Sequence, residues 1–105
     1  MTKFDLEQAL ATQMKQVGLP TPVRQFKAIP GRKFAFDFAW PDAKNKLLVE
    51  VNGGIWIKGG HSTGLGISRD YEKSNLAQIN GYKVFHFSSD MINNGTAVET
   101  IEKED

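Results

Sequence analysis

An alternating segment restricts the fold of this chain more than any other feature. Between residues 33 and 40 the sequence KFAFDFAW places a large aromatic residue at every second position. A period of two is typical of a β-strand with one buried face. Turn-forming residues follow at 41–45 (PDAKN), and the segment KLLVEVN occupies 46–52. The two segments predict an antiparallel hairpin, and its aromatic residues are expected on one buried face: Phe34, Phe36, Phe38 and Trp40.

The register of this hairpin brings two acidic residues opposite each other. If its loop comprises residues 42–45, Asp37 faces Glu50. Directly opposed residues share a face, with Cβ atoms about 4.5–5.5 Å apart, and like charges at such positions destabilise a sheet. A hard divalent cation such as Mg²⁺ would compensate for the repulsion, because it binds carboxylate oxygens. The alternatives are a register shifted by one residue, or an acid paired with Lys or Arg on a solvated face.

Helical periodicity precedes the hairpin. Apolar residues recur with the helical period over residues 4–17, and Gly18 and Pro20 then end the helix. Residues 23–28 (VRQFKA) predict a further strand between this helix and the hairpin.

The C-terminal half predicts a helix, a strand and a last helix. The helix at 67–80 is closed by Gly81, and a strand follows at 82–87. Cap-forming residues at 88–90 (SSD) precede the last helix. The helix at 67–80 has the length of a crossover between the strand at 46–52 and the strand at 82–87, which makes these two strands parallel.

Composition supports one domain and excludes several kinds of site. We expect residues 1–105 to form a single α/β domain, a mixed central sheet with an antiparallel hairpin and a crossover helix, flanked by helices. The absence of cysteine excludes a disulfide scaffold, a thiolate nucleophile and a Cys-based zinc site. No apolar segment approaches the roughly 20 residues that cross a bilayer, and the first residues contain no signal-peptide core. We therefore expect a cytoplasmic protein without a membrane partner.

Charge is unevenly distributed along the chain. Residues 1–46 contain eight Lys and Arg against four Asp and Glu, whereas residues 47–105 contain five against eight. This distribution predicts a local basic face rather than a wide DNA-coating surface.

A glycine-rich segment follows the hairpin. Residues 53–66 (GGIWIKGGHSTGLG) contain six glycines, which allow backbone N–H groups to approach phosphate closely. The segment lacks the Lys-Ser/Thr of a P-loop, so nucleotide hydrolysis is not favoured. Trp56 and Lys58 are candidates to stack on a base and to pair with phosphate, respectively. The alternative for Trp56 is a structural role, in which it anchors the loop to the core.

The hairpin and the segments after it resemble a known family. The sequences FDFAW at 36–40 and LLVEVNGG at 47–54 are similar to the restriction-endonuclease-like, or PD-(D/E)XK, superfamily. Within it, the chain looks most like the small nuclease domains related to very-short-patch-repair endonucleases. Further matches to this branch extend over residues 7–90: Glu7, His61, Asp70, Lys73, Gly81, Tyr82, Val84 and Phe85.

The resemblance implies a metal site. Asp37 and Glu50 would be the metal ligands, the backbone carbonyl of Val51 would complete the set, and Glu7 would approach from the first helix. The implied ion is Mg²⁺, with Mn²⁺ as a substitute. The sequence departs from the wider superfamily at Asn52, where a lysine that helps to activate the attacking water is expected.

Two residues are candidates to replace that lysine, namely His61 and Lys73. A histidine with an unperturbed pKa of about 6.5 exchanges protons near neutral pH. The alternatives are a solvent-exposed loop histidine, and a surface ion pair between Asp70 and Lys73. His86, inside the last predicted strand, is interpreted as structural.

The resemblance and the acid pair together predict a metal-dependent DNA endonuclease acting in repair, recombination or phage DNA processing, in the cytoplasm of a bacterial or phage-infected cell. RNA is the other possible substrate. A single domain without an added reader predicts low-specificity or structure-selective cutting, as a monomer or a homodimer. The candidate nucleic-acid contacts are Trp56, Lys58, Arg69 and Lys33. The alternatives are a catalytically weakened nucleic-acid-binding domain of the same fold and a small structural or assembly protein.

Overall fold

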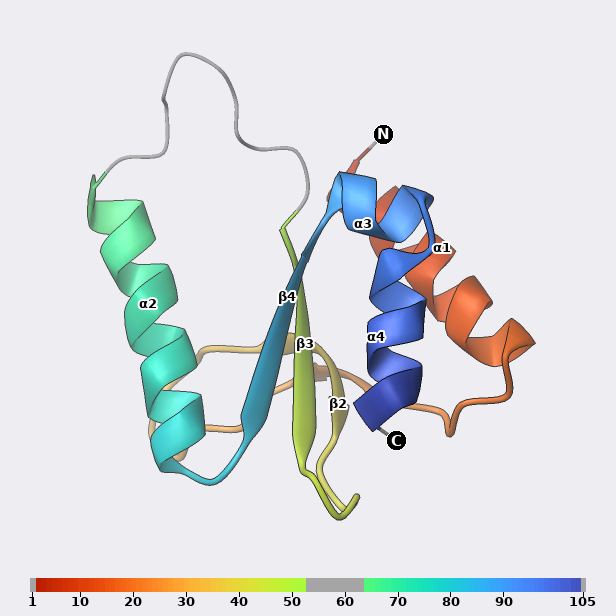
Figure 1. Ribbon diagram of the computed structural model, residues 1–105. Helices are drawn as coiled ribbons and strands as arrows, with labels where there is room; N and C mark the ends of the chain where they lie inside the picture. The colour runs from red at the N-terminus through yellow and green to blue at the C-terminus, as the bar shows by residue number, and fades with distance from the viewer. Residues whose placement is uncertain (1, 53–63, 105) are drawn as a thin grey trace.

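A four-stranded mixed sheet with helices on both faces forms the core of the protein (Figure 1). The computed structural model describes residues 2–52 and 64–104, with side chains from residue 68 onward in the second range. The elements in chain order are α1 (Lys3–Gln16), β1 (Val23–Phe26), β2 (Phe36–Trp40), β3 (Leu47–Asn52), α2 (Gly64–Ile79), β4 (Lys83–Ser88), α3 (Ser89–Asn93) and α4 (Thr96–Glu104).

The topology of the sheet confirms the predicted α/β class. The strand order is β1-β2-β3-β4; β1, β2 and β3 are antiparallel neighbours, and β3 and β4 are parallel. Helix α2 is the crossover between the two parallel strands and covers one face of the sheet, whereas α1, α3 and α4 cover the other (Figure 1). The carboxyl ends of β3 and β4 and the start of α1 consequently lie at the same end of the molecule.

The hairpin has the predicted register. Ala39 pairs with Leu48 and Trp40 with Leu47, and the ladder between β2 and β3 ends at Phe38 and Val49. The next pair in this register is Asp37 and Glu50, so the alternative of a register shifted by one residue is wrong.

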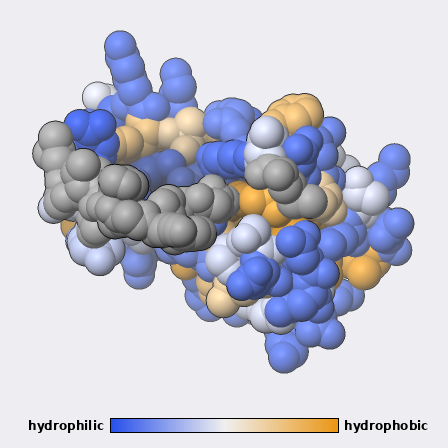
Figure 2. All heavy atoms as spheres, turned by 90° about the horizontal axis from the view of Figure 1, so that it is seen from above, coloured by the Kyte–Doolittle hydropathy of each residue, from blue (hydrophilic) through white to orange (hydrophobic). Residues whose placement is uncertain are grey.

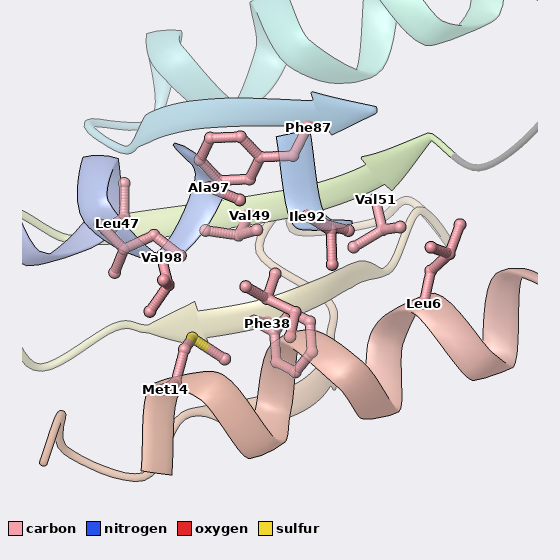
Figure 3. Close-up of a cluster of buried hydrophobic side chains, with 12 residues drawn as sticks. Leu6, Met14, Phe38, Leu47, Val49, Val51, Phe87, Ile92, Ala97 and Val98 are labelled. Atoms are coloured by element: carbon pink, nitrogen blue, oxygen red, sulfur yellow. The ribbon is translucent and has the colours of Figure 1, made fainter. Parts of the chain in front are cut away.

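The sheet separates two hydrophobic clusters. The larger one lies between the sheet and α1, α3 and α4 (Figure 3). Its buried members are Leu6, Leu10, Met14, Phe38, Leu47, Val49, Val51, Phe87, Ile92, Ala97, Val98 and Ile101. The smaller cluster lies on the face of α2, with Ala28, Ile29, Phe36, Ala39, Leu48 and Ala77 buried.

The prediction of one aromatic face was wrong. Phe38 and Trp40 pack in the larger cluster, but Phe36 and Phe34 pack in the smaller one on the opposite face. The alternation is lost at Asp37, where the backbone N–H donates to a Glu50 side-chain oxygen beyond the end of the ladder. The predicted strand at 33–40 is accordingly shorter and begins at Phe36.

Capping residues lie at the helix boundaries that the sequence predicts. Gly18 and Gly81 follow α1 and α2 with φ of 81° and 91°, values that glycine adopts without strain. Ser88 caps α3 by accepting a hydrogen bond from the Met91 N–H. The predicted last helix is divided into α3 and α4, because Gly95 takes a φ of 87° between them. Within residues 2–52 and 64–104, no helix is long and apolar enough to span a membrane.

Candidate functional site

Asp37 and Glu50 meet where β2 and β3 separate. Side chains replace the backbone ladder here: the Asp37 N–H donates to Glu50 Oε1 at 3.0 Å, and the Val51 N–H donates to Asp37 Oδ2 at 2.8 Å. Asp37 is only 1% exposed, the lowest value among the buried charged residues that the structure describes. The prediction that the hairpin brings these two acids together is confirmed.

Helix α1 delivers a cation and a third acid to this point. Lys3 Nζ lies 2.9 Å from Asp37 Oδ1 and 3.6 Å from Glu7 Oε2. Lys3 and Glu7 are four residues apart and therefore share one face of α1. Glu7 and Asp37 thus share Lys3 as a partner. The Thr2–Asp5 capping box fixes the start of the helix directly around Lys3.

Strand β1 adds Gln25, a residue that no sequence motif indicates. Gln25 Nε2 donates to Asp37 Oδ1 at 3.2 Å and lies 3.4 Å from Glu7 Oε1, so its amide bridges two acids. Gln25 has a φ of 50°, a left-handed conformation that costs a residue with a side chain on the order of 1–3 kcal/mol. Arg24 completes this side of the site, with Nη2 3.4 Å from Glu7 Oε1.

Helix α2 delivers a second lysine from the opposite face. Lys73 Nζ lies 2.7 Å from Glu50 Oε2, donates to the Ala35 carbonyl and sits 4.5 Å from the centre of the Phe36 ring. The alternative in which Lys73 forms a surface pair with Asp70 is therefore wrong. The nearly buried pair lies on the same side of β3 as Asn52, because Glu50 and Asn52 are two positions apart on the strand.

Burial and charge change the proton affinities within the site. Burial raises the pKa of Glu50, and the nearby Asp37 charge adds to the rise, while the hydrogen bond from Lys73 opposes it. Burial alone would lower the pKa of Lys3, but the hydrogen bond and charge of Asp37, with smaller contributions from Glu50 and Glu7, raise it. Lys3 therefore remains a cation at neutral pH.

His86 and Asn52 lie beside the acids. His86 is the register partner of Glu50 across the parallel pair β3–β4, and its Nδ1 lies 3.2 Å from Asn52 Oδ1. Its Nε2 lies 3.5 Å from Ser74 Oγ of α2. Burial lowers the pKa of His86 and the Lys73 charge adds to this effect, partly offset by Asp70. The position of His86 inside a strand predicts a structural role, and only the pairing of β3 with β4 connects it to the site.

The remaining predicted site residues are either exposed or outside the part of the chain that the structure describes. Lys33 and Arg69 are exposed. Trp56, Lys58 and His61 lie outside the described residues. Figure 2 views the molecule from the end at which β3 and β4 terminate, and most of the described surface there is hydrophilic, with smaller hydrophobic patches.

The charges at this point are balanced by the protein itself. In the described parts of the chain, no group of three or more His, Cys, Asp or Glu residues is arranged to hold a metal ion. Each oxygen of Asp37 and Glu50 instead accepts a hydrogen bond from a protein N–H or ammonium group.

Lys3 and Gln25 carry no sequence motif. The i,i+4 spacing of Lys3 and Glu7 was the one available signal for Lys3.

The comparisons with known proteins give no relative. The sequence matches no family model, and neither a curated protein nor a solved structure matches the chain.

Proposed function

We propose that this protein is a metal-dependent endonuclease of the restriction-endonuclease-like class, which hydrolyses phosphodiester bonds in DNA. The observation that carries the proposal is the buried opposition of Asp37 and Glu50 between lysines that reach them from both faces of the sheet. Two carboxylates withdrawn from water and held together cost stability. Such arrangements with perturbed proton affinity occur preferentially at functional sites.

The donor chemistry fits Mg²⁺. This ion is usually held by one or two carboxylates and keeps waters and phosphate oxygens as its other ligands. Asp37, Glu50 and the Val51 carbonyl would hold it, with Glu7 beside them. One of the groups now bonded to Asp37 is the Lys3 ammonium group, which is about half exposed on a flexible stem and can turn away. When bound, Mg²⁺ or Mn²⁺ would stabilise negative charge on the phosphate and lower the pKa of a water.

Lys73 supports the enzyme class. Asn52 cannot supply the positive charge that the superfamily places at its position, but Lys73 supplies one to the same face of β3, 2.7 Å from Glu50. An ammonium group here can donate a hydrogen bond to a phosphate oxygen or orient an attacking water.

A catalytically weakened nucleic-acid-binding domain is the second candidate. Asn52 favours it, because its amide oxygen faces His86 Nδ1 at 3.2 Å rather than the acids. The complete pairing of the Asp37 and Glu50 oxygens by protein donors also favours it.

Calorimetric titration with Mg²⁺ and Mn²⁺, followed by incubation with branched, nicked and linear DNA, tests the proposal. The wild type should bind metal and cut DNA, and the isosteric Asp37→Asn/Glu50→Gln variant should do neither. Lys3→Met should bind metal several-fold more tightly than the wild type, because the ion no longer competes with an ammonium group 2.9 Å from Asp37. Glu72→Gln is the matched control, since Glu72 forms an exposed pair with Arg32.

The possible outcomes separate the candidates. Metal binding without cutting of any DNA favours the weakened binding domain. If the wild type binds neither ion, with or without DNA, the metal site and the nuclease proposal both fail.

A further inference from the structure

A hollow beside the acids takes no part in the chemistry proposed above. It encloses about 570 Å³, within the range of small-molecule sites. The described residues that line it come from the ends of β3 and β4 and from α2: Asn52, Asp70, Tyr71, Ser74, Asn75 and His86.

The hollow directly adjoins the proposed reaction site. Asn52 follows Glu50 by two positions on β3 and therefore lies on the same face of the sheet. His86 is the register partner of Glu50 on β4. On α2, Lys73 points to Glu50, while Ser74, one position later, lines the hollow. A ligand in the hollow would thus lie next to a phosphate held at Glu50 and Lys73.

The chemistry of the lining favours an uncharged ring over a phosphate. The described residues that line the hollow include no lysine or arginine, and Asp70 contributes a carboxylate that repels anions. The carboxamide of the exposed Asn75 offers paired donor and acceptor atoms, the pattern that reads the edge of a base. Asp70 can accept a hydrogen bond from a sugar hydroxyl or an exocyclic amine.

Tyr71 adds a stacking surface. Its side chain is 66% exposed although it is aromatic and lies on a helix that packs against the sheet. Aromatic rings that remain exposed beside polar groups are the usual platforms on which single-stranded bases stack. A base within a duplex is already stacked and paired, so it must be extruded at a cost before it can enter such a site.

We propose that this hollow binds an unpaired nucleobase adjacent to the phosphodiester held at Glu50 and Lys73, with the base stacked on Tyr71 and its edge bonded by Asn75. The inference rests on the proposed nuclease function and specifies the substrate class, which is nucleic acid with a single-stranded or frayed nucleotide next to the cleaved bond.

Fluorescence measurements without catalysis test this proposal. A short single-stranded DNA with 2-aminopurine in place of one adenine, the RNA of the same sequence and a blunt DNA duplex are titrated with the full chain in EDTA and in Ca²⁺. The wild type should bind a single strand more tightly than the duplex and quench the 2-aminopurine. Tyr71→Ala should lose affinity for the single strand on the order of tenfold or more. Tyr71→Phe, which keeps the ring, should retain it.

A matched variant and a second readout keep the test decisive. Ile79→Ala removes another exposed apolar side chain of α2, outside the hollow, and should bind as the wild type does. Thermal unfolding of each variant checks that the fold is intact. Tyr71-dependent binding of either the DNA or the RNA strand supports the proposal. Unchanged single-strand binding by Tyr71→Ala, or equal affinity for the duplex, overturns it.

The same proteins separate this inference from the proposed function. Suppose that calorimetry shows metal binding that requires Asp37 and Glu50, while Tyr71→Ala binds the single strand as the wild type does. The proposed base-binding role of the hollow is then wrong, and the nuclease proposal stands. If single-strand binding depends on Tyr71 but the protein binds no metal, the base-binding role of the hollow is supported and the nuclease proposal is contradicted.

Discussion

The two faces of the sheet are built from the same strands but differ along their length. On the face of α1, α3 and α4, strand β3 presents Leu47, Val49 and Val51, which are all buried in one apolar cluster. On the face of α2 the same strand presents Leu48, then Glu50 and Asn52. Strand β4 changes in the same direction, from Val84 to His86 and Ser88. Along β3, the side chains toward α1, α3 and α4 are therefore all apolar, whereas those toward α2 become polar at the carboxyl end of the strand.

This difference separates the larger apolar cluster, which stabilises the fold, from the polar end of the α2 face, where Glu50, Lys73 and His86 lie. Three helices contribute side chains to the larger cluster, which contains twelve buried residues against six in the smaller one. The face of α2 can then give up apolar packing at one end, where Glu50, Lys73 and His86 gather. Proteins commonly place costly polar groups where another region supplies the stability.

The largest expected effect compares the two packing faces. Leu10→Ala, at a fully buried position of α1, should lower the free energy of unfolding by about 2–5 kcal/mol. Leu76→Ala, on α2, should cost roughly 1–2 kcal/mol, because Leu76 is only partly buried. Urea denaturation measures both values. Equal losses of unfolding free energy would show that the two faces contribute equally to stability and would contradict the prediction.

A smaller effect tests the charge pair on the face of α2. Lys73→Met should raise the pKa of Glu50 further and cost about 1–3 kcal/mol at neutral pH, because a nearly buried carboxylate loses its partner. Lys83→Met is the matched control, since the Lys83–Glu104 pair has the same 2.7 Å separation but is 48% and 22% exposed rather than 16% and 14%. The control should cost at most about 1 kcal/mol. An NMR titration of the Glu50 carboxyl and urea denaturation provide the two readouts, and identical costs for both variants would contradict the prediction.

The smallest effect is a dependence of stability on pH, with opposite signs for two neighbours. The pKa of Glu50 is above its ordinary value of 4.5 in the folded state, so the folded protein binds more protons and its stability falls as pH rises through the window above 4.5. The pKa of His86 is below 6.5, so the unfolded state binds more protons and stability falls as pH drops below 6.5.

Unfolding in urea between pH 4.5 and 7.5 separates the two groups. The wild type relative to Glu50→Gln should lose stability with rising pH, and the wild type relative to His86→Gln should gain it. The same slope in both comparisons would show that at least one of these groups has an ordinary environment.

Much of the architecture could be predicted because its causes are local. The hairpin register follows from a short loop and two alternating strands, and it correctly placed Asp37 opposite Glu50. The helix ends at Gly18 and Gly81 follow from glycine conformations. Phe36 was assigned to the wrong face for the opposite reason: the strand loses its alternation where a side chain of β3 replaces a backbone partner, and no local pattern encodes that exchange.

The sequence by itself determined the acid pair, because neighbouring strands joined by a short turn have few possible registers. The tertiary structure decided what surrounds the pair. Lys3 lies 34 residues before Asp37, Lys73 lies 23 residues after Glu50, and Gln25 reaches the site through a left-handed backbone. The packing of helices on the two faces, rather than any spacing along the chain, brings these groups to the acids, because the charge of a buried carboxylate must be compensated by whatever the fold places next to it.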